Sequence, residues 1–298
     1  MQGPAVPPTE DRNPRSAGLD LLETRRILEI INEEDRTVAA AVARALDGVA
    51  HAVDLAVAAL SRNGRVVYLG AGTSGRLAVL DAAELPPTFG FPPDRVVAIL
   101  AGGDAALQGA VEGAEDDALE AVARMRDLAV GASDCVIGIT ASGTTRFVLG
   151  GMGEARERGA STVLVHCGPP AGAGPWDQVV ALDTGPEVVA GSTRLKAGTA
   201  TKMVLNMIST AAMVRLGKVH DNLMVDVRAT NAKLRRRAAR IVEILAGVTP
   251  ERAAKALERC NGEAKTAVVA LRRGVDAAAA RTFLESHGGR LRAALEAR

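Results

Sequence analysis

The stretch VVYLGAGTSG, residues 66–75, joins a short apolar run to a turn that contains three glycines. A run of this kind that leads into the spacing G-x-G-x-x-G is typical of a strand, a phosphate-binding turn and the start of a helix. Further short apolar runs follow at 96–100, 135–140, 162–166 and 179–182, with helical patterns between them that end near residues 84, 128 and 157. Apolar strands that alternate with helices indicate a parallel sheet covered on both faces. The sequence therefore predicts an α/β fold, a three-layer α/β/α sandwich.

Helical segments are expected on both sides of this sheet. Apolar residues recur every three or four positions in 21–64, which predicts two amphipathic helices separated near 34–36. A long helix is expected at about 195–216, and Ala, Arg, Glu and Leu dominate beyond residue 231, which predicts helices near 232–246, 250–259, 263–272 and 276–285. We expect a disordered lead (1–18), an α/β domain with N-terminal helices (19–231) and a small helical domain (232–298).

Composition limits the class of protein. The 298 residues are 48% hydrophobic, enough for a large core, and a net charge of +1 gives no reason to expect a nucleic-acid or membrane partner. The basic run KLRRRAAR, residues 233–240, is expected to be a solvated helix face, because no aromatic residues accompany it. Three cysteines and four histidines lack metal-ligand spacing, so no metal is predicted. The sequence shows neither a signal-peptide pattern nor a bilayer-spanning run, and we expect a cytoplasmic protein.

The glycine turn fits a small phosphate ester better than a dinucleotide. A dinucleotide site usually has an acid at the end of the second strand, and here the only candidate, Asp104, follows two glycines. Hydroxyls and helix-start amides can instead donate to a phosphate, and the first turn offers Gly72, Thr73, Ser74 and Gly75. A second such turn, after 135–140, offers Ser142, Gly143, Thr144 and Thr145. Any one Ser or Thr is at least as well explained as a helix cap, but the repetition predicts a sugar-phosphate site.

Longer blocks of the sequence resemble a known family. They are INEED, GAGTSGRLAVLDAAELPPTFG, AGGDAAL, EGAEDD, IGITASG, GPEVVAGSTRLKAGTATKMVLNMISTAAMVRLGKV and NLMVDVRATNAKL. Together they are similar to the sugar isomerase (SIS) superfamily and, within it, to the N-acetylmuramic acid 6-phosphate etherase family, from about residue 20 to the C-terminus. One departure is ASGTTRFV, where that family typically has ASGRTPYV, so that Thr144 and Arg146 stand at the variable positions.

The resemblance implies a function. Members of that family are carbon–oxygen lyases that cleave the D-lactyl ether at C3 of N-acetylmuramic acid 6-phosphate, giving N-acetylglucosamine 6-phosphate and D-lactate in cell-wall sugar recycling. A base removes the C2 proton of the open-chain sugar, an acid protonates the departing lactyl oxygen, and water then adds at C3. No cofactor is implied. The resemblance further implies a SIS fold for 19–231 and a homodimer, and the helices of 232–298 resemble a small ubiquitin-associated-like unit.

The family's two essential glutamates match Glu84 in DAAELPP and Glu115 in EGAEDD. Glu84 is expected at the end of a short helix, before two prolines, where the helix dipole and apolar neighbours disfavour a charged carboxylate and suit a general acid. Glu115 is expected to begin the next helix, whose positive end favours the ionised form of a base, although two adjacent aspartates oppose it. Our hypothesis is that Glu84 is the acid and Glu115 the base, with Glu112 as the substitute if that helix starts earlier.

The block GPEVVAGSTRLKAGT supplies further expected sugar contacts, because in related folds this segment lines the sugar site. The residues are Glu187, Ser192, Thr193, Arg194 and Lys196. Arg194 or Lys196 could bind the lactyl carboxylate or the phosphate, and a structural salt bridge is about equally expected for each.

Two other functions fit the same pocket. A sugar-phosphate isomerase or epimerase would need a base at C2 and no acid at the C3 oxygen, so the presence of both Glu84 and Glu115 favours elimination. A non-catalytic, sugar-phosphate-sensing SIS regulator typically carries a DNA-binding domain or a second SIS copy, and 298 residues with balanced charge leave room for neither.

Overall fold

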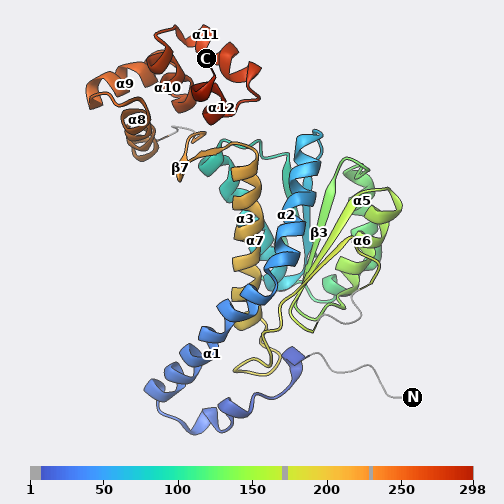
Figure 1. The fold of residues 1–298 in the computed structure, drawn as a ribbon. Coiled ribbons are helices and arrows are strands. Elements are labelled where there is room, and N and C mark those ends of the chain that lie inside the picture. Colours follow the sequence, from blue (N-terminus) through green and yellow to red (C-terminus); the bar gives the residue numbers. More distant parts are fainter. Residues whose placement is uncertain (1–7, 170–173, 228–230, 298) are drawn as a thin grey trace. The chain divides into compact units, whose positions relative to one another are not determined.

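A computed structural model of the chain describes residues 8–169, 174–227 and 231–297 (Figure 1). The chain divides into two compact units. The first comprises Met1–Ala82 and Asp94–Ser209, and the second comprises Ala83–Pro93 and Thr210–Arg298. Two of the three division points fall inside helices, α3 (Gly72–Phe89) and α7 (Lys196–Arg215), so each of these helices contributes to both units.

The first unit contains a five-stranded parallel sheet. Its strands are β1 (Val66–Gly70), β2 (Val96–Leu100), β3 (Cys135–Thr140), β4 (Ser161–His166) and β5 (Gln178–Ala181), in the order β2-β1-β3-β4-β5. The predicted parallel α/β fold is confirmed, and every strand bound agrees within one residue. The chain passes from β1 to one side and returns to the other side as β3, and ligands bind at such a switch point in parallel sheets.

Helices cover both faces of this sheet (Figure 1). On one face lie α5 (Ala118–Asp127) and α6 (Arg146–Glu157), while α2 (Leu46–Ser61) and α7 lie on the other. The wholly buried Phe147 and Met152 of α6 pack on the sheet. The helix can approach β3 closely because residue 138 is glycine, where a Cβ would lie only 2.1 Å from the sulfur of Met152. Small residues therefore set the packing distance between these layers.

Two predicted helix boundaries were wrong. The N-terminal helices do not separate near 34–36, because α1 runs unbroken over Thr24–Arg44 and α2 follows after Ala45. Glu34 is buried inside α1 and paired there, so the charged run is part of the helix. The helix expected to end near Glu84 continues through both prolines to Phe89. A proline inside a helix removes a backbone N–H and crowds the carbonyl four residues earlier, and the buried Leu85 and Phe89 offset this cost by apolar packing of the final turn.

The predicted disordered lead was wrong for residues 8–18. These residues include the 3-10 turns η1 (Pro8–Glu10) and η2 (Pro14–Ser16), and η3 (Leu19–Leu21) follows them. Thr9 and Asn13 are buried, because the segment packs on the loop before α7 through hydrogen bonds such as that from Asn13 Nδ2 to the carbonyl of Pro186, 3.3 Å. Residues 1–7 of the predicted lead lie outside the described part of the chain.

A buried carboxylate joins three elements of the first unit. Asp81 of α3 accepts hydrogen bonds from the hydroxyl of Tyr68 in β1 (3.0 Å), from Asn206 Nδ2 (2.8 Å) and from Ser209 Oγ (3.0 Å), both of α7. Burial raises the pKa of Asp81, while the three donors act in the opposite direction. Since every donor is directed at one carboxylate, this residue fixes α3 and α7 against β1.

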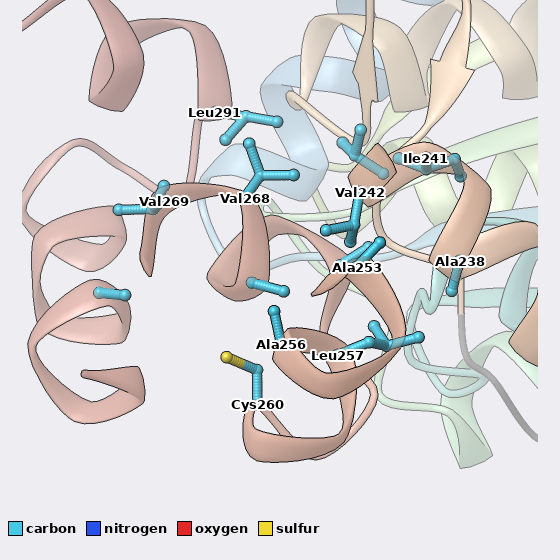
Figure 2. Packing of buried hydrophobic residues seen from close by; sticks show 14 of the residues in the cluster. Ala238, Ile241, Val242, Ala253, Ala256, Leu257, Cys260, Val268, Val269 and Leu291 are labelled. Carbon is cyan, nitrogen blue, oxygen red and sulfur yellow. The ribbon is translucent and has the colours of Figure 1, made fainter. Parts of the chain in front are cut away.

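The second unit is built of helices and one short hairpin. It includes β6 (Val219–His220), β7 (Leu223–Met224), α8 (Ala232–Ala246), α9 (Pro250–Arg259), α10 (Ala264–Arg273), α11 (Ala277–Ser286) and α12 (Leu291–Glu296). Figure 2 shows its core, in which Val242, Leu257 and Val268 come from three different helices. The four predicted C-terminal helices are confirmed within one residue, whereas the hairpin and α12 are too short for the periodicity to reveal.

The Asp81 network leads to a stability prediction. Asp81→Ala should lower the free energy of unfolding by about 3 kcal/mol or more, because the buried donors Tyr68 and Ser209 and the half-buried Asn206 lose their acceptor. Chemical denaturation at neutral pH measures this change. Asp127→Ala, at an exposed position in the last turn of α5, is the control and should change it by less than about 0.5 kcal/mol. Equal effects of the two changes would contradict the assignment.

Candidate active site

The first hydroxyl-rich turn lies between β1 and α3. The helix begins at Gly72, which has φ +52°, a value that favours glycine, and Thr73 and Ser74 lie half-buried in its first turn. The first N–H groups of a helix have no partner inside the helix, so they are free to receive an anion. Gly75 is buried, and a Cβ there would lie 2.4 Å from Leu100 Cδ1 and 2.7 Å from the carbonyl oxygen of Gly70. Glycine therefore allows this turn to press against the sheet.

The second turn lies between β3 and α6 and contains a chain of hydroxyl hydrogen bonds. The hydroxyls of Thr140 and Thr145 are 2.7 Å apart, and the amide of Gly143, which has φ +79°, donates to Thr140 Oγ1 at 3.3 Å. The amide and the hydroxyl of Thr144 both donate to Ser142 Oγ, at 3.1 and 2.9 Å. Thr145 is the N-cap residue of α6 but makes no side-chain cap bond. Because the side chain of Thr145 does not cap α6, the first backbone N–H groups of this helix remain available to a ligand.

The two turns are neighbours because β1 pairs directly with β3, with Gly70 opposite Ile139. The start of α7 lies at the first turn, where a Cβ on Gly198 would come within 3.5 Å of Thr73 Cγ2. His166, at the end of β4, was missed by the sequence analysis. It is buried, its Nδ1 is 3.4 Å from where a Cβ on Gly143 would lie, and burial lowers its pKa. Its place at the end of the next strand was the only available signal.

Two of the residues predicted before α7 have internal partners. Glu187 is wholly buried, and its carboxylate accepts the backbone N–H groups of Lys196 and Ala197, each at 2.9 Å, which caps the start of α7. Lys196 is 2% exposed, and its Nζ lies 2.7 Å from Glu34 Oε2, an atom that also accepts from Asn13 at 2.8 Å. Because both charged groups are already bound by partners inside the protein, the geometry gives Glu187 and Lys196 a structural role.

The other three residues of this block remain available to a ligand. Ser192 and Thr193 are half-buried, and the Arg194 side chain is exposed. The structure therefore divides the five predicted residues into two buried structural residues and three accessible ones.

Glu115 lines a small pocket of the first unit. The pocket has a volume of about 360 Å³, and its lining includes Gly72, Arg76, Glu112 and Glu115. Glu115 does not begin α5, as was predicted, but lies in the 3-10 turn η4 (Ala114–Asp116) and is exposed. The cap of α5 is Asp117, whose side chain accepts from the amide of Glu120 at 2.9 Å. The helix-dipole argument for Glu115 as a base was therefore wrong. Its position in a pocket beside the first turn is still compatible with that role.

Glu84 lies within α3, five residues before the end of that helix, and its side chain is exposed. The prediction that it ends a helix was wrong, so the dipole argument for a general acid does not apply to it. By its contacts Glu84 belongs to the second unit, whereas Glu115 belongs to the first. The division of roles between the two glutamates stays a hypothesis that rests on the family resemblance.

The described residues also bear on metal binding and on membrane insertion. No group of three or more His, Cys, Asp or Glu residues there is arranged to hold a metal ion. No helix in the described ranges is long and apolar enough to span a membrane.

Comparisons with known proteins define the class. Residues 48–156 match the family model described as the glucokinase regulatory protein N-terminal SIS domain. Solved structures with a similar fold include phosphoheptose isomerases from Neisseria gonorrhoeae and Francisella tularensis. Their TM-scores are both 0.48, their identities are 18% and 19%, and each alignment covers 63% of this chain and 98% or 100% of the other. The family-model match over residues 48–156 shows that the chain contains a SIS-type domain.

Full-length relatives define the family. A protein of Mycolicibacterium smegmatis named N-acetylmuramic acid 6-phosphate etherase is 52% identical over 290 residues, 97% of each chain. A protein of Yersinia pestis with the same name is 51% identical over 288 residues, 96% of this chain and 98% of the other. The chain belongs to the N-acetylmuramic acid 6-phosphate etherase family, as the sequence motifs indicated.

The pair of Glu34 and Lys196 leads to a second stability prediction. Glu34→Ala leaves the Lys196 ammonium buried without its partner and should lower the free energy of unfolding at pH 7 by about 3–5 kcal/mol. Arg15→Ala is the matched control, because Arg15 pairs with the same carboxylate but is 64% exposed, and it should cost less than about 1 kcal/mol.

The same pair should make stability depend on pH. Burial alone would raise the pKa of Glu34, but hydrogen bonds from Lys196 and Asn13 outweigh it and leave the pKa below its ordinary value. The stabilisation is therefore complete above about pH 4.3 and is lost as the pH falls through the lower folded-state pKa. The difference between wild type and Glu34→Ala should shrink in that range. A difference that grew on acidification would contradict the pairing.

Proposed function

We propose that the chain cleaves the D-lactyl ether of N-acetylmuramic acid 6-phosphate, giving N-acetylglucosamine 6-phosphate and D-lactate. The observation that carries the proposal is that Glu115, a glutamate in the family motif, shares a pocket with Gly72 of the first turn. This arrangement fits a base that acts on a sugar whose phosphate is held at the turns. Family membership over nearly the full chain supports the same substrate.

The phosphate is expected to bind where the two turns meet. Thr73, Ser74, Ser142, Thr144 and Thr145 would donate from hydroxyls, and the starts of α3 and α6 would donate from backbone N–H groups. A dianion at two helix N-termini is stabilised by both dipoles. Binding at this point would leave the sugar carbons directed toward neighbouring side chains, Ser192, Thr193 and Arg194 among them.

The reaction would proceed by proton transfers alone. Glu115 takes the C2 proton of the open-chain aldehyde, the C3–O bond breaks as the double bond forms, and Glu84 gives its proton to the lactyl oxygen. Water then adds at C3 of the unsaturated aldehyde. Glu84, now a carboxylate, accepts one proton of the water, and the proton held by Glu115 returns to C2. This step gives N-acetylglucosamine 6-phosphate and restores both side chains. General acid–base catalysis of this kind contributes about 10²–10⁴-fold for each group.

We also propose that the protein works as a cytoplasmic homodimer. The apolar side chains of Leu21 and Leu28, 84% and 56% exposed, support an interface at the N-terminal helical segment. Three free, buried cysteines fit a reducing compartment. Light scattering on the purified protein tests the dimer, and a monomeric mass at micromolar concentration would contradict it.

The assay for the main proposal is release of D-lactate from purified protein and N-acetylmuramic acid 6-phosphate. Lactate in stoichiometric amount with N-acetylglucosamine 6-phosphate is the expected result. Binding of the sugar without any product would instead favour a regulator. Conversion to a ketose or an epimer would favour an isomerase or epimerase.

The roles of the glutamates are tested in D₂O. Glu84→Ala should keep exchange of the C2 hydrogen and lose lactate release by about 10²–10⁴-fold, because only protonation of the leaving group is removed. Glu115→Ala should lose both. Glu112→Ala is the control, because Glu112 lines the same pocket, and it should keep both. Loss of C2 exchange in Glu112→Ala but not in Glu115→Ala would move the base to Glu112.

A further inference from the structure

The segment that carries Glu115 has little apolar packing of its own. Between β2 and α5 the chain forms turns, the four-residue helix α4 (Ala105–Gln108) and η4. Within 104–117 only Ala106 is buried, and Leu107 and Val111 are 39% and 41% exposed. A segment of this kind gains little from the hydrophobic effect, so other interactions must hold it.

Arg76 of α3 supplies such an interaction. Its Nε donates to the carbonyl of Ala106 at 2.8 Å, and its Nη2 donates to the carbonyl of Gly109 at 2.6 Å. Both carbonyls belong to the end of α4, where a helix leaves its last carbonyls without internal partners. A planar guanidinium can satisfy two acceptors at once, and hydrogen bonds from a charged donor are stronger than neutral ones.

The other fixed point of the segment lies at the start of α5. There Ala118 touches α6 so closely that a Cβ on Gly150 would lie 2.8 Å from the Ala118 Cβ. Glu115 lies between this contact and the carbonyls that Arg76 binds. Within the described residues Glu115 has no hydrogen bond or ion pair of its own. Its position therefore depends on where the backbone of the segment is held.

We infer that Arg76 is a positioning residue that holds Glu115 at the mouth of the phosphate-binding turn. The inference rests on the proposed function, in which Glu115 is the base. Arg76 directly follows Gly75 of that turn, and it lines the same pocket as Gly72 and Glu115. One side chain thus connects the site that holds the phosphate to the segment that carries the base. A displacement of about 1 Å at a reacting group is enough to cost about 10²-fold in rate.

The experiment compares Arg76→Ala and Arg76→Lys with Arg95→Ala as the matched control. Arg95 has the same chemistry elsewhere in the first unit, since its Nε and Nη2 donate to the carbonyls of Gly64 and Leu60, both at 2.9 Å. It precedes β2, at the end of the sheet away from the turns. General loss of stability should therefore affect both alanine variants, while loss of positioning should affect only Arg76→Ala.

For Arg76→Ala we expect kcat for lactate release and the rate of C2 exchange to fall together, by about 10–100-fold. KM should change less than about threefold, because the hydroxyl turns are untouched. Arg76→Lys and added guanidinium should each restore part of kcat. Arg95→Ala should keep kcat within about threefold of wild type. Amide hydrogen exchange over 104–115 should rise in Arg76→Ala and stay unchanged in Arg95→Ala.

Three results would overturn the inference. The first is an unchanged kcat in Arg76→Ala, and the second is a rise in KM with kcat retained, which would make Arg76 a direct ligand of the substrate. The third is unchanged amide exchange over 104–115. This last measurement needs no turnover, so it decides whether Arg76 holds the segment even if the wild type releases no lactate, the result that would contradict the proposed function itself.

Discussion

The parallel pairing of β1 with β3 is the interaction on which the candidate site depends. It runs from Val66 opposite Cys135 to Gly70 opposite Ile139, so both strands end at the same level. Each strand continues into a hydroxyl-rich turn and a helix N-terminus, and the pairing makes these two turns neighbours. Neither turn alone offers more than a few donors. Placed together at the switch point of the sheet, they bring their hydroxyls and helix-start amides to one point, which is the basis of the proposed phosphate site.

Charged residues buried inside the first unit help to fix this arrangement of turns. Glu187 caps α7, and Lys196 pairs with Glu34 of α1. The ionisable side chains of Glu187 and Lys196 are therefore buried and bound inside the first unit. A buried pair adds little net stability over an apolar pair of the same size, but it requires one definite geometry. The start of α7 lies against Thr73, and a defined position of this helix therefore helps to define the first turn.

The sequence predicted those features that depend on local pattern. Apolar runs placed every strand within one residue, because burial on two faces leaves a strong local signal. Glycine spacing placed the first turn, and a repeated set of hydroxyl residues placed the second. The failures involve contacts between distant positions. Nothing near Lys196 indicates a partner 162 residues away, and nothing near Glu84 shows that buried Leu85 and Phe89 carry the helix past two prolines. The placement of Glu115 in η4 depends on contacts of the same kind.

Helix α3 connects several parts of the candidate site. Gly75 lets it approach the sheet, Arg76 holds the segment that carries Glu115, and Asp81 binds β1 and α7. Glu84 follows on the same helix. A phosphate held at the first turn of α3, as proposed, would lie next to Arg76, which binds the segment that carries Glu115. Under the proposed function, the binding energy of the phosphate would then help to orient a base that is remote from it.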